Sequence, residues 1–248
     1  MKRQGTSTRY GGTMKKRIGK ALSALAVPGY WPSLARGVVP GFEHGEAFTG
    51  YEFSTVLDVG ANKGQFAMFA RHRWPEARLV CFEPLPAPRG RLSKLVRSGA
   101  EIHPIALGDY EGDADMHLAS REDSSSLLAL GDVQKRLFSM DESRLLTVPV
   151  RRLDAVFQAN DLSRPTLLKI DVQGFEFEVL QGASGLLHAV DGVYVECSFV
   201  ELYIGQKLAS AVTEFLNSFG LAETGRFNVS RDGDVEVQAD FLFTRESR

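Results

Sequence analysis

Residues 55–67 read T-V-L-D-V-G-A-N-K-G-Q-F-A, and this stretch decides the fold of the chain. Its apolar first half suits a buried parallel strand. Gly60 and Gly64 then permit positive φ angles and close backbone approach, and Phe66 and Phe69 recur at helical spacing. The stretch therefore predicts a strand, a ligand-binding turn and a helix, the opening unit of an α/β domain.

Asp58 limits which ligand such a turn receives. A loop built for pyrophosphate offers bare backbone N–H groups at a helix N-terminus, and a carboxylate beside them would repel the phosphates. An acid at this position fits a ligand that has positive charge. A generic nucleotide-binding turn, or a plain strand-to-helix connection, remains open on this stretch alone.

Length and composition predict one globular domain with an N-terminal extension. The 248 residues are 44% hydrophobic, enough for one substantial core. We expect residues 1–50 to form a basic extension and cover segment, and residues 51–248 to form the domain. Cys81 and Cys197 lack metal-ligand spacing, which favours a reduced, cytoplasmic protein.

Charge is distributed unevenly along the chain. Residues 1–42 contain eight Lys or Arg and no acid, while the whole chain has a formal charge of −2, so the domain itself is acidic. An acidic body argues against a nucleic-acid partner. Residues 14–27 have the pattern of a short basic amphipathic helix, which either packs on the domain or makes weak contact with a membrane surface. No run reaches the length of a transmembrane helix.

Residues 28–50 contain three prolines and predict an irregular cover segment. His44 lies in it, either as a substrate contact or base above the ligand site, or as a solvated or hydrogen-bonded side chain. Farther along, Ser125 and Ser126 either hold a sugar or carboxylate, or belong to a flexible loop.

The second predicted strand, residues 78–82, ends at Glu83. In nucleotide-binding βαβ units an acid at this place accepts hydrogen bonds from two ribose hydroxyls, and Glu83 follows Gly64 by 19 positions, close to the usual spacing. An exposed strand-end carboxylate is the alternative. The third predicted strand, residues 100–107, ends in apolar residues including Ala106 that could wall an adenine.

The remaining pattern predicts a regular α/β succession. Strands are expected at residues 114–119, 146–153, 193–197 and 236–244, the last pairing antiparallel at the sheet edge. Helices are expected at residues 65–73, 89–97, 131–140 and 208–219, with a short one beginning at Asp154.

Residues 167–176, L-L-K-I-D-V-Q-G-F-E, form a second strand-acid-glycine stretch. Lys169 and Asp171 share one strand face by the period of two, and Gln173 and Glu176 follow. Glu196 would lie beside Asp171 if the next strand is its neighbour. These groups converge at the edge where open α/β sheets bind ligands, although a buried ion pair or a helix cap is also compatible with them.

Five motifs together resemble the FkbM family of S-adenosylmethionine (SAM)-dependent methyltransferases: V-L-D-V-G-A-N-K-G at 56–64, F-E-P-L-P at 82–86, I-A-L-G-D at 105–109, R-R-L-D at 151–154 and K-I-D-V-Q-G-F-E at 169–176. The resemblance implies a class I, Rossmann-like, seven-stranded, mostly parallel sheet of order 3-2-1-4-5-7-6 with helices on both faces. It also implies O-methylation of a saccharide, glycosylated metabolite or polyketide hydroxyl. The residues it places around SAM are Asp58, Gly60, Asn62 and Gly64 at the methionine part, Glu83 at the ribose and Ala106 at the adenine.

Physical argument supplies the catalytic candidates. Methyl transfer to an alcohol needs alignment of the two reactants and removal of the hydroxyl proton by a carboxylate or histidine. We expect Asp171 to be the base, with Glu196 and His44 as further candidates, and Lys169 to orient Asp171 or contact the substrate. Divalent-metal assistance stays open, but the sequence shows no dense carboxylate cluster and leans against it.

Two other functions are compatible with parts of the sequence. A non-catalytic SAM-binding partner protein would keep the same loop. A nicotinamide-dependent oxidoreductase is suggested only by the Tyr203-x-x-x-Lys207 spacing, without the glycine-rich pyrophosphate turn that it needs. The acceptor and the oligomeric state are not determined by the sequence.

Overall fold

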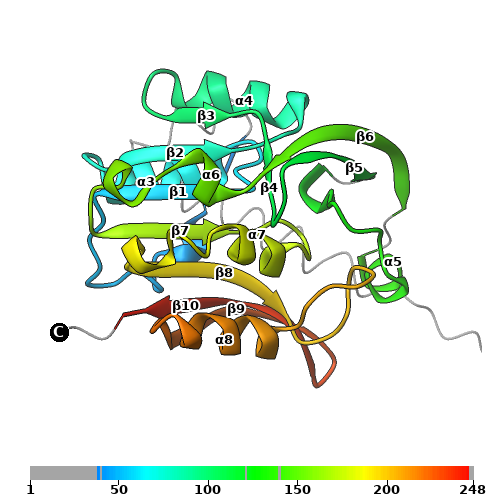
Figure 1. The fold of residues 1–248 in the computed structure, drawn as a ribbon. Helices are drawn as coiled ribbons and strands as arrows, with labels where there is room; N and C mark the ends of the chain where they lie inside the picture. The colour runs from blue at the N-terminus through cyan, green and yellow to red at the C-terminus, as the bar shows by residue number, and fades with distance from the viewer. Residues whose placement is uncertain (1–37, 40, 121, 139–140, 246–248) are drawn as a thin grey trace, which may run out of the picture.

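The computed structural model describes residues 38–39, 41–120, 122–138 and 141–245. Its centre is a sheet of seven strands in the order β3-β2-β1-β7-β8-β10-β9 (Figure 1). Counted along the chain within this sheet, the order is 3-2-1-4-5-7-6, as expected. The strands are β1 (Thr55–Val59), β2 (Arg78–Phe82), β3 (Glu101–His103), β7 (Thr166–Ile170), β8 (Gly192–Ser198), β9 (Ala222–Asp232) and β10 (Val235–Thr244).

Only β10 runs against its neighbours, β8 and β9; the pairs from β3 to β8 are parallel. Parallel strands place their carboxyl ends along one edge. The loops after β1, β2 and β7 therefore lie together, which confirms the expected Rossmann-like architecture.

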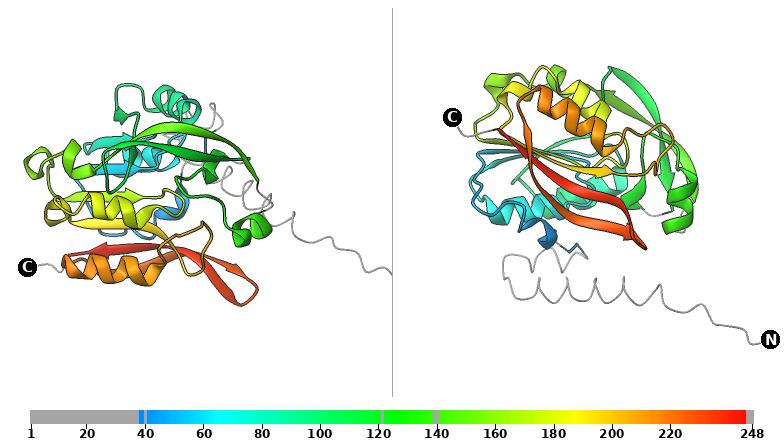
Figure 2. Two further views of the ribbon diagram at one scale, coloured as in Figure 1. Left: turned by 45° about the vertical axis from the view of Figure 1, so that its right-hand side comes forward. Right: turned by 90° about the horizontal axis from the view of Figure 1, so that it is seen from below.

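Helices cover both faces of the sheet (Figure 2). The side-chain period of two sends alternate residues of β1 into different cores. Leu57 and Val59 pack with the helices of one face, whereas Val56 packs with those of the other. The first face has α6 (Leu153–Val156), α7 (Glu176–Gly182) and α8 (Ala209–Ser218); the second has α3 (Gln65–Arg73) and α4 (Pro86–Val96).

A second, three-stranded sheet of order β4-β6-β5 is an addition that the sequence reading did not predict. It comprises β4 (Ala106–Leu107), β5 (Gly112–Ala119) and β6 (Glu142–Arg151). The expected single strand at residues 100–107 is wrong, because Pro104, which has no N–H to donate, separates β3 from β4. Ala106 thus belongs to the second sheet.

The other elements lie close to their predicted positions. The helix α5 (Asp132–Phe138) and the 3-10 turns η2 (Phe42–His44), η3 (Glu122–Ser124), η4 (Ala159–Asp161) and η5 (Leu187–Ala189) complete the described elements. The expected sheet order includes a strand at the place of β9, but its residue range was not predicted, because as an edge strand β9 exposes most of its residues. The predicted helix at 14–27 lies outside the described residues.

Both cysteines are buried free thiols, as expected for core positions. Across the described part of the chain, no helix has the length and hydrophobicity needed to span a membrane.

Candidate functional site

A cavity of about 640 Å³ opens at the carboxyl-terminal edge of the large sheet. It collects side chains from the loops after β1, β2 and β7, from β8, β9 and β10, from the second sheet and from the cover segment. Its polar and charged lining residues are Glu43, His44, Asn62, Gln65, Glu83, Asp123, Ser125, Lys169, Asp171, Gln173, Glu196, Asn228 and Asp240.

Gly60 allows the turn after β1 to pass against the end of β7. Its φ is 76°, and a Cβ added there would lie 1.9 Å from the Asp171 carbonyl oxygen. Only glycine combines that conformation with that contact. The sequence thereby brings the glycine turn and the Asp171 loop to one place. Asn62 follows with a φ of 49° and lines the cavity.

Glu83 is held by backbone donors from two loops. Its Oε2 accepts a hydrogen bond from the Asn62 N–H at 2.9 Å, and its Oε1 accepts one from the Leu85 N–H at 2.8 Å. Burial raises the pKa of Glu83 to about 7 despite these donors. Each oxygen accepts one of these bonds and has a further lone pair, and Glu83 lines the cavity. Ile105 and Ala106 line the apolar part of the same region.

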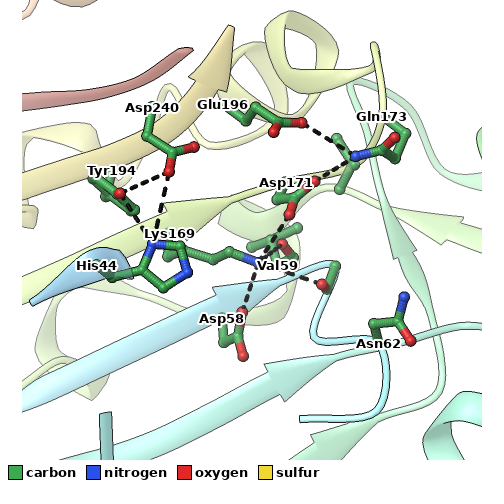
Figure 3. Close-up of polar contacts among 12 residues, drawn as sticks. His44, Asp58, Val59, Asn62, Lys169, Asp171, Gln173, Tyr194, Glu196 and Asp240 are labelled. Atoms are coloured by element: carbon green, nitrogen blue, oxygen red, sulfur yellow. Dashed lines mark hydrogen bonds and ion pairs between the residues drawn. The ribbon is translucent and has the colours of Figure 1, made fainter. Parts of the chain in front are cut away.

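Asp58 does not line the cavity. It is fully buried, and its Oδ1 lies 3.1 Å from the Lys169 Nζ, directly across the β1–β7 pairing (Figure 3). Lys169 lines the cavity and also lies 3.9 Å from the Asp171 Oδ2. Burial disfavours the ammonium, but the two carboxylates outweigh it and raise the pKa of Lys169. Gly64 likewise stays outside the lining, with Leu92 and Leu95 packed against it.

Gln173 connects the two acids expected beside each other. Its Nε2 donates to Asp171 Oδ1 at 2.8 Å and to Glu196 Oε2 at 3.2 Å (Figure 3). Its Oε1 accepts a hydrogen bond from the Tyr203 hydroxyl at 2.9 Å. Burial, followed by the nearby charge of Asp171, raises the pKa of Glu196 well above its usual value.

The loop between β7 and α7 is organised by Glu176. This buried side chain accepts hydrogen bonds through Oε1 from the N–H groups of Val172 and Gly174, at 3.1 and 3.0 Å. Burial raises the pKa of Glu176 to about 7. Glu176 does not line the cavity, so its role is to shape the loop that presents Asp171 and Gln173.

The opposite side of the cavity has a polar network that sequence reasoning missed. Tyr194 donates through its hydroxyl to Asp240 Oδ2 at 2.8 Å, and its oxygen lies 3.0 Å from His44 Nδ1. Asn228 donates to the same carboxylate oxygen at 2.7 Å. One signal was present in the sequence: Asp240 interrupts the otherwise apolar end of β10.

Of the remaining residues considered from the sequence, some line the cavity and others do not. Ser125 lines the cavity, whereas Ser126 is buried and its Oγ accepts a hydrogen bond from the Leu128 N–H. Tyr203 is buried outside the cavity lining and Lys207 is exposed, which removes the proposed oxidoreductase pair. Within the described residues, no group of three or more His, Cys, Asp and Glu side chains is arranged to hold a metal ion.

The donor side of the cavity fits SAM. The buried Asn62 Oδ1 has no hydrogen-bond partner within the described part of the chain, so it can accept from an ammonium or amino group. Glu83 provides two acceptor oxygens for ribose hydroxyls. Ala106 and Leu107 provide an apolar wall for a base.

Comparison with known proteins agrees with this fit. The family model described as the methyltransferase FkbM domain matches residues 58–221. The 2-O-methyltransferase NoeI of Sinorhizobium fredii is 30% identical over 189 residues, which span 73% of this chain and 77% of NoeI. The hexuronic acid methyltransferase AglP of Haloferax volcanii is 26% identical over 146 residues, 58% of this chain and 56% of AglP.

A solved structure shows the same fold. The methyltransferase FkbM from Methylobacillus flagellatus superposes with a TM-score of 0.52 at 14% identity, over 94% of this chain and 60% of the solved chain. The family match, which covers more than half of the chain, decides the assignment. This chain belongs to the FkbM family of SAM-dependent methyltransferases.

Proposed function

We propose that this protein transfers the methyl group of SAM to a hydroxyl oxygen of a saccharide, with glycosylated metabolites and polyketides as related acceptors. The observation that supports this most directly is the composition of the cavity. A SAM-type side built on Asn62, Glu83 and Ala106 meets a side rich in carboxyl, amide and imidazole groups. The relatives named as a 2-O-methyltransferase and a hexuronic acid methyltransferase point to the same chemistry.

On the donor side, we assign each expected residue a role from its position. Glu83 binds the ribose, Ala106 contacts the adenine, and Asn62 contacts the methionine part. Gly60 provides the close turn, and Gly64 shapes the loop by packing. When bound, SAM supplies a methyl group activated by a positively charged sulfonium.

Asp58 acts indirectly in this proposal. Its carboxylate is buried behind Lys169, so it holds the ammonium in place instead of touching the ligand. Lys169 in turn lies near the Val59 and Gly60 carbonyl oxygens, at 3.5 and 3.4 Å. The ion pair holds the Lys169 ammonium in the cavity lining between the donor side and the acceptor side.

On the acceptor side, Asp171 and Glu196 take different roles. Asp171, which contacts both Gln173 and Lys169, accepts a hydrogen bond from an acceptor hydroxyl. Glu196, which accepts a hydrogen bond from Gln173, contacts a second polar group of the acceptor. Asp171, Glu196 and His44, the three bases expected from the sequence, all line the cavity and stay candidates to accept the hydroxyl proton.

The proposal also includes the location of the protein, its partners and its metal requirement. We place the protein in the cytoplasm, without a nucleic-acid partner, and assign it no metal. Weak contact of residues 14–27 with a membrane surface is kept as a subsidiary expectation. We also place the boundary between the N-terminal extension and the methyltransferase domain near residue 50.

The test combines binding with transfer. Calorimetry should detect SAM and its demethylated product and give no heat with NAD. Methyl-labelled SAM incubated with an extract of the native cells should label a hydroxylated compound. Binding of SAM without labelling of any compound, across extracts and a broad glycan panel, would support the non-catalytic alternative. Binding of NAD without SAM would contradict the proposal altogether.

A further inference from the structure

The imidazole of His44 is enclosed on the α3 side of the sheet. Its ring makes edge-on contacts with Phe66, Phe69 and Tyr194, with ring centroids 5.2, 5.9 and 5.4 Å away. Gly41 leaves room for it, because a Cβ there would lie 2.5 Å from His44 Cδ2 and 2.8 Å from Nε2. These contacts restrict rotation of the ring.

The two ring nitrogens have different surroundings. Nδ1 lies 3.0 Å from the Tyr194 hydroxyl oxygen and 3.7 Å from Asp240 Oδ2. Nε2 has no hydrogen-bond partner within the residues that the structure describes, and the His44 side chain lines the cavity. Figure 3 shows the contacts of Nδ1 converging on Tyr194 and Asp240. One nitrogen is thus engaged by the protein, and the other is available.

With Asp240 ionised, proton counting around Tyr194 places a hydrogen on Nδ1 of His44. An ionised Asp240 has no proton, so the single hydroxyl proton of Tyr194 goes to Asp240 Oδ2, 2.8 Å away. The Tyr194 oxygen then accepts from His44, which requires hydrogen on Nδ1. Nε2 is left with a free lone pair. Asn228 supports this arrangement by donating to the same Asp240 oxygen at 2.7 Å.

The charges agree with this tautomer. Burial lowers the pKa of His44, and Asp240 only partly opposes it, so the imidazole is neutral at pH 7. Burial raises the pKa of Tyr194, so the phenol keeps its proton. Burial also raises the pKa of Asp240, while His44, Asn228 and Tyr194 favour its ionised form. The geometry therefore provides a neutral base with an oriented partner.

We propose that His44 is the base of the methyl transfer, acting through Nε2, and that Tyr194, Asp240 and Asn228 are positioning residues that hold its Nδ1–H tautomer. This inference rests on the proposed function. The acceptor O–H bond breaks and its proton moves to Nε2 as the oxygen bonds to the methyl carbon. The carbon–sulfur bond electrons stay on sulfur, so the positive charge passes from the sulfonium to an imidazolium facing Asp240.

The first test reads the tautomer without any acceptor. The sequence has five histidines, and long-range proton–nitrogen NMR of protein labelled with ring-15N histidine resolves each ring; His44→Gln identifies the signals of His44. At pH 7 and above, we expect hydrogen on Nδ1 and a bare Nε2. Tyr194→Phe removes only the hydroxyl and should give a mixture of tautomers. Hydrogen on Nε2 in the unmodified protein, or no change in Tyr194→Phe, would overturn the proposal.

The second test uses turnover of the full chain once an acceptor is in hand. His44→Gln should lower kcat by about 10²- to 10⁴-fold, the usual contribution of a general base, and leave the Kd of SAM within about twofold. Asp171→Asn should lower kcat by only about tenfold, because an amide oxygen still accepts a hydrogen bond. A larger loss of kcat in Asp171→Asn than in His44→Gln would assign the base to Asp171 and contradict the proposal.

His188→Gln is the matched control, because His188 is exposed and precedes β8 at the opposite edge of the sheet. It should leave kcat unchanged. If no compound accepts a methyl group from the unmodified protein, the proposed function fails; the tautomer measurement still gives its own answer about His44.

Discussion

Lys169 Nζ lies 3.1 Å from Asp58 Oδ1, between paired positions of the adjacent strands β7 and β1. Both side chains are almost entirely enclosed, with relative exposures of 7% and 0%. The acid of the glycine stretch is therefore neutralised inside the protein. In the proposed function, Asp58 acts on the ligand only through the position of the Lys169 ammonium.

This ion pair predicts strong coupling between the two residues. Lys169→Met should destabilise the fold by about 3–5 kcal/mol, because it leaves a buried carboxylate without its partner. Asp58→Asn should be harmful for the converse reason. The double variant Asp58→Asn, Lys169→Met should recover most of the lost stability, measured by urea unfolding. Additive losses in the double variant would show that the two residues do not form a coupled pair.

Glu83 predicts a pH dependence of SAM binding. Burial raises the pKa of Glu83 to about 7 in the free protein, and the charge of Asp58 adds to this rise. The Leu85 and Asn62 N–H donors and the charge of Arg89 lower the pKa, but by less. Two ribose hydroxyls pair with two carboxylate oxygens only in the ionised form, so binding below the pKa must release a proton. The Kd of SAM should rise by about tenfold from pH 8 to pH 6.

Calorimetry across this range is the measurement, with Glu83→Gln as the matched variant. That substitution should weaken SAM binding by about tenfold or more and remove the contribution of Glu83 to the pH dependence. An unchanged pH dependence in Glu83→Gln would assign it to another group.

The same titration affects the stability of the ligand-free protein. A carboxyl group whose folded-state pKa is raised from 4.5 to about 7 stabilises the fold fully below pH 4.5, and this contribution is lost as the pH rises through 7. Glu176, with the same direction and a value of about 7, acts in the same window. Ligand-free stability from these two groups therefore declines between about pH 4.5 and 7.

Substitution of Gly60 and of Gly50 by alanine distinguishes the cost of backbone strain from the cost of a close contact. Both have positive φ angles, 76° and 83°, but an added Cβ meets the Asp171 carbonyl oxygen at Gly60 and open space at Gly50. Gly50→Ala should cost about 1–2 kcal/mol, the cost of the left-handed conformation alone. Gly60→Ala should cost clearly more and weaken SAM binding, because β1 and the Asp171 loop must move apart. Equal losses of stability in thermal unfolding would refute the close contact.

The strands of the large sheet were predicted well because each is marked by a pattern within a short stretch of sequence. The apolar runs of β1, β2 and β7 each end in polar residues and turns, and the parallel register then brings Glu83 and Asp171 to one edge. The second sheet was missed as a unit because pairing between β5 and β6 depends on contacts distant in sequence. Pro104 was the available signal for the break between β3 and β4.

The sequence predicted which residues line the site better than it predicted which residues contact one another there. Asp171, Glu196 and His44 do line one cavity, and Gln173 of the 169–176 motif contacts both acids. The partners of His44, in contrast, come from elements that no local motif indicates. Asp240 and Asn228 arrive through antiparallel strands at the far side of β8, and Asn228 lies on an edge strand with weak periodicity. Asp58 could not be assigned to Lys169 without the β1–β7 register.

The proposed function requires that this cavity methylates an oxygen atom. The most direct measurement is NMR of the product formed from SAM labelled with 13C in its methyl group, using the acceptor isolated from native cells. We expect a single labelled methyl ether, with the label correlated to the carbon that bore the acceptor hydroxyl. A label attached to nitrogen or carbon, or SAM consumed without any labelled product, would contradict this account.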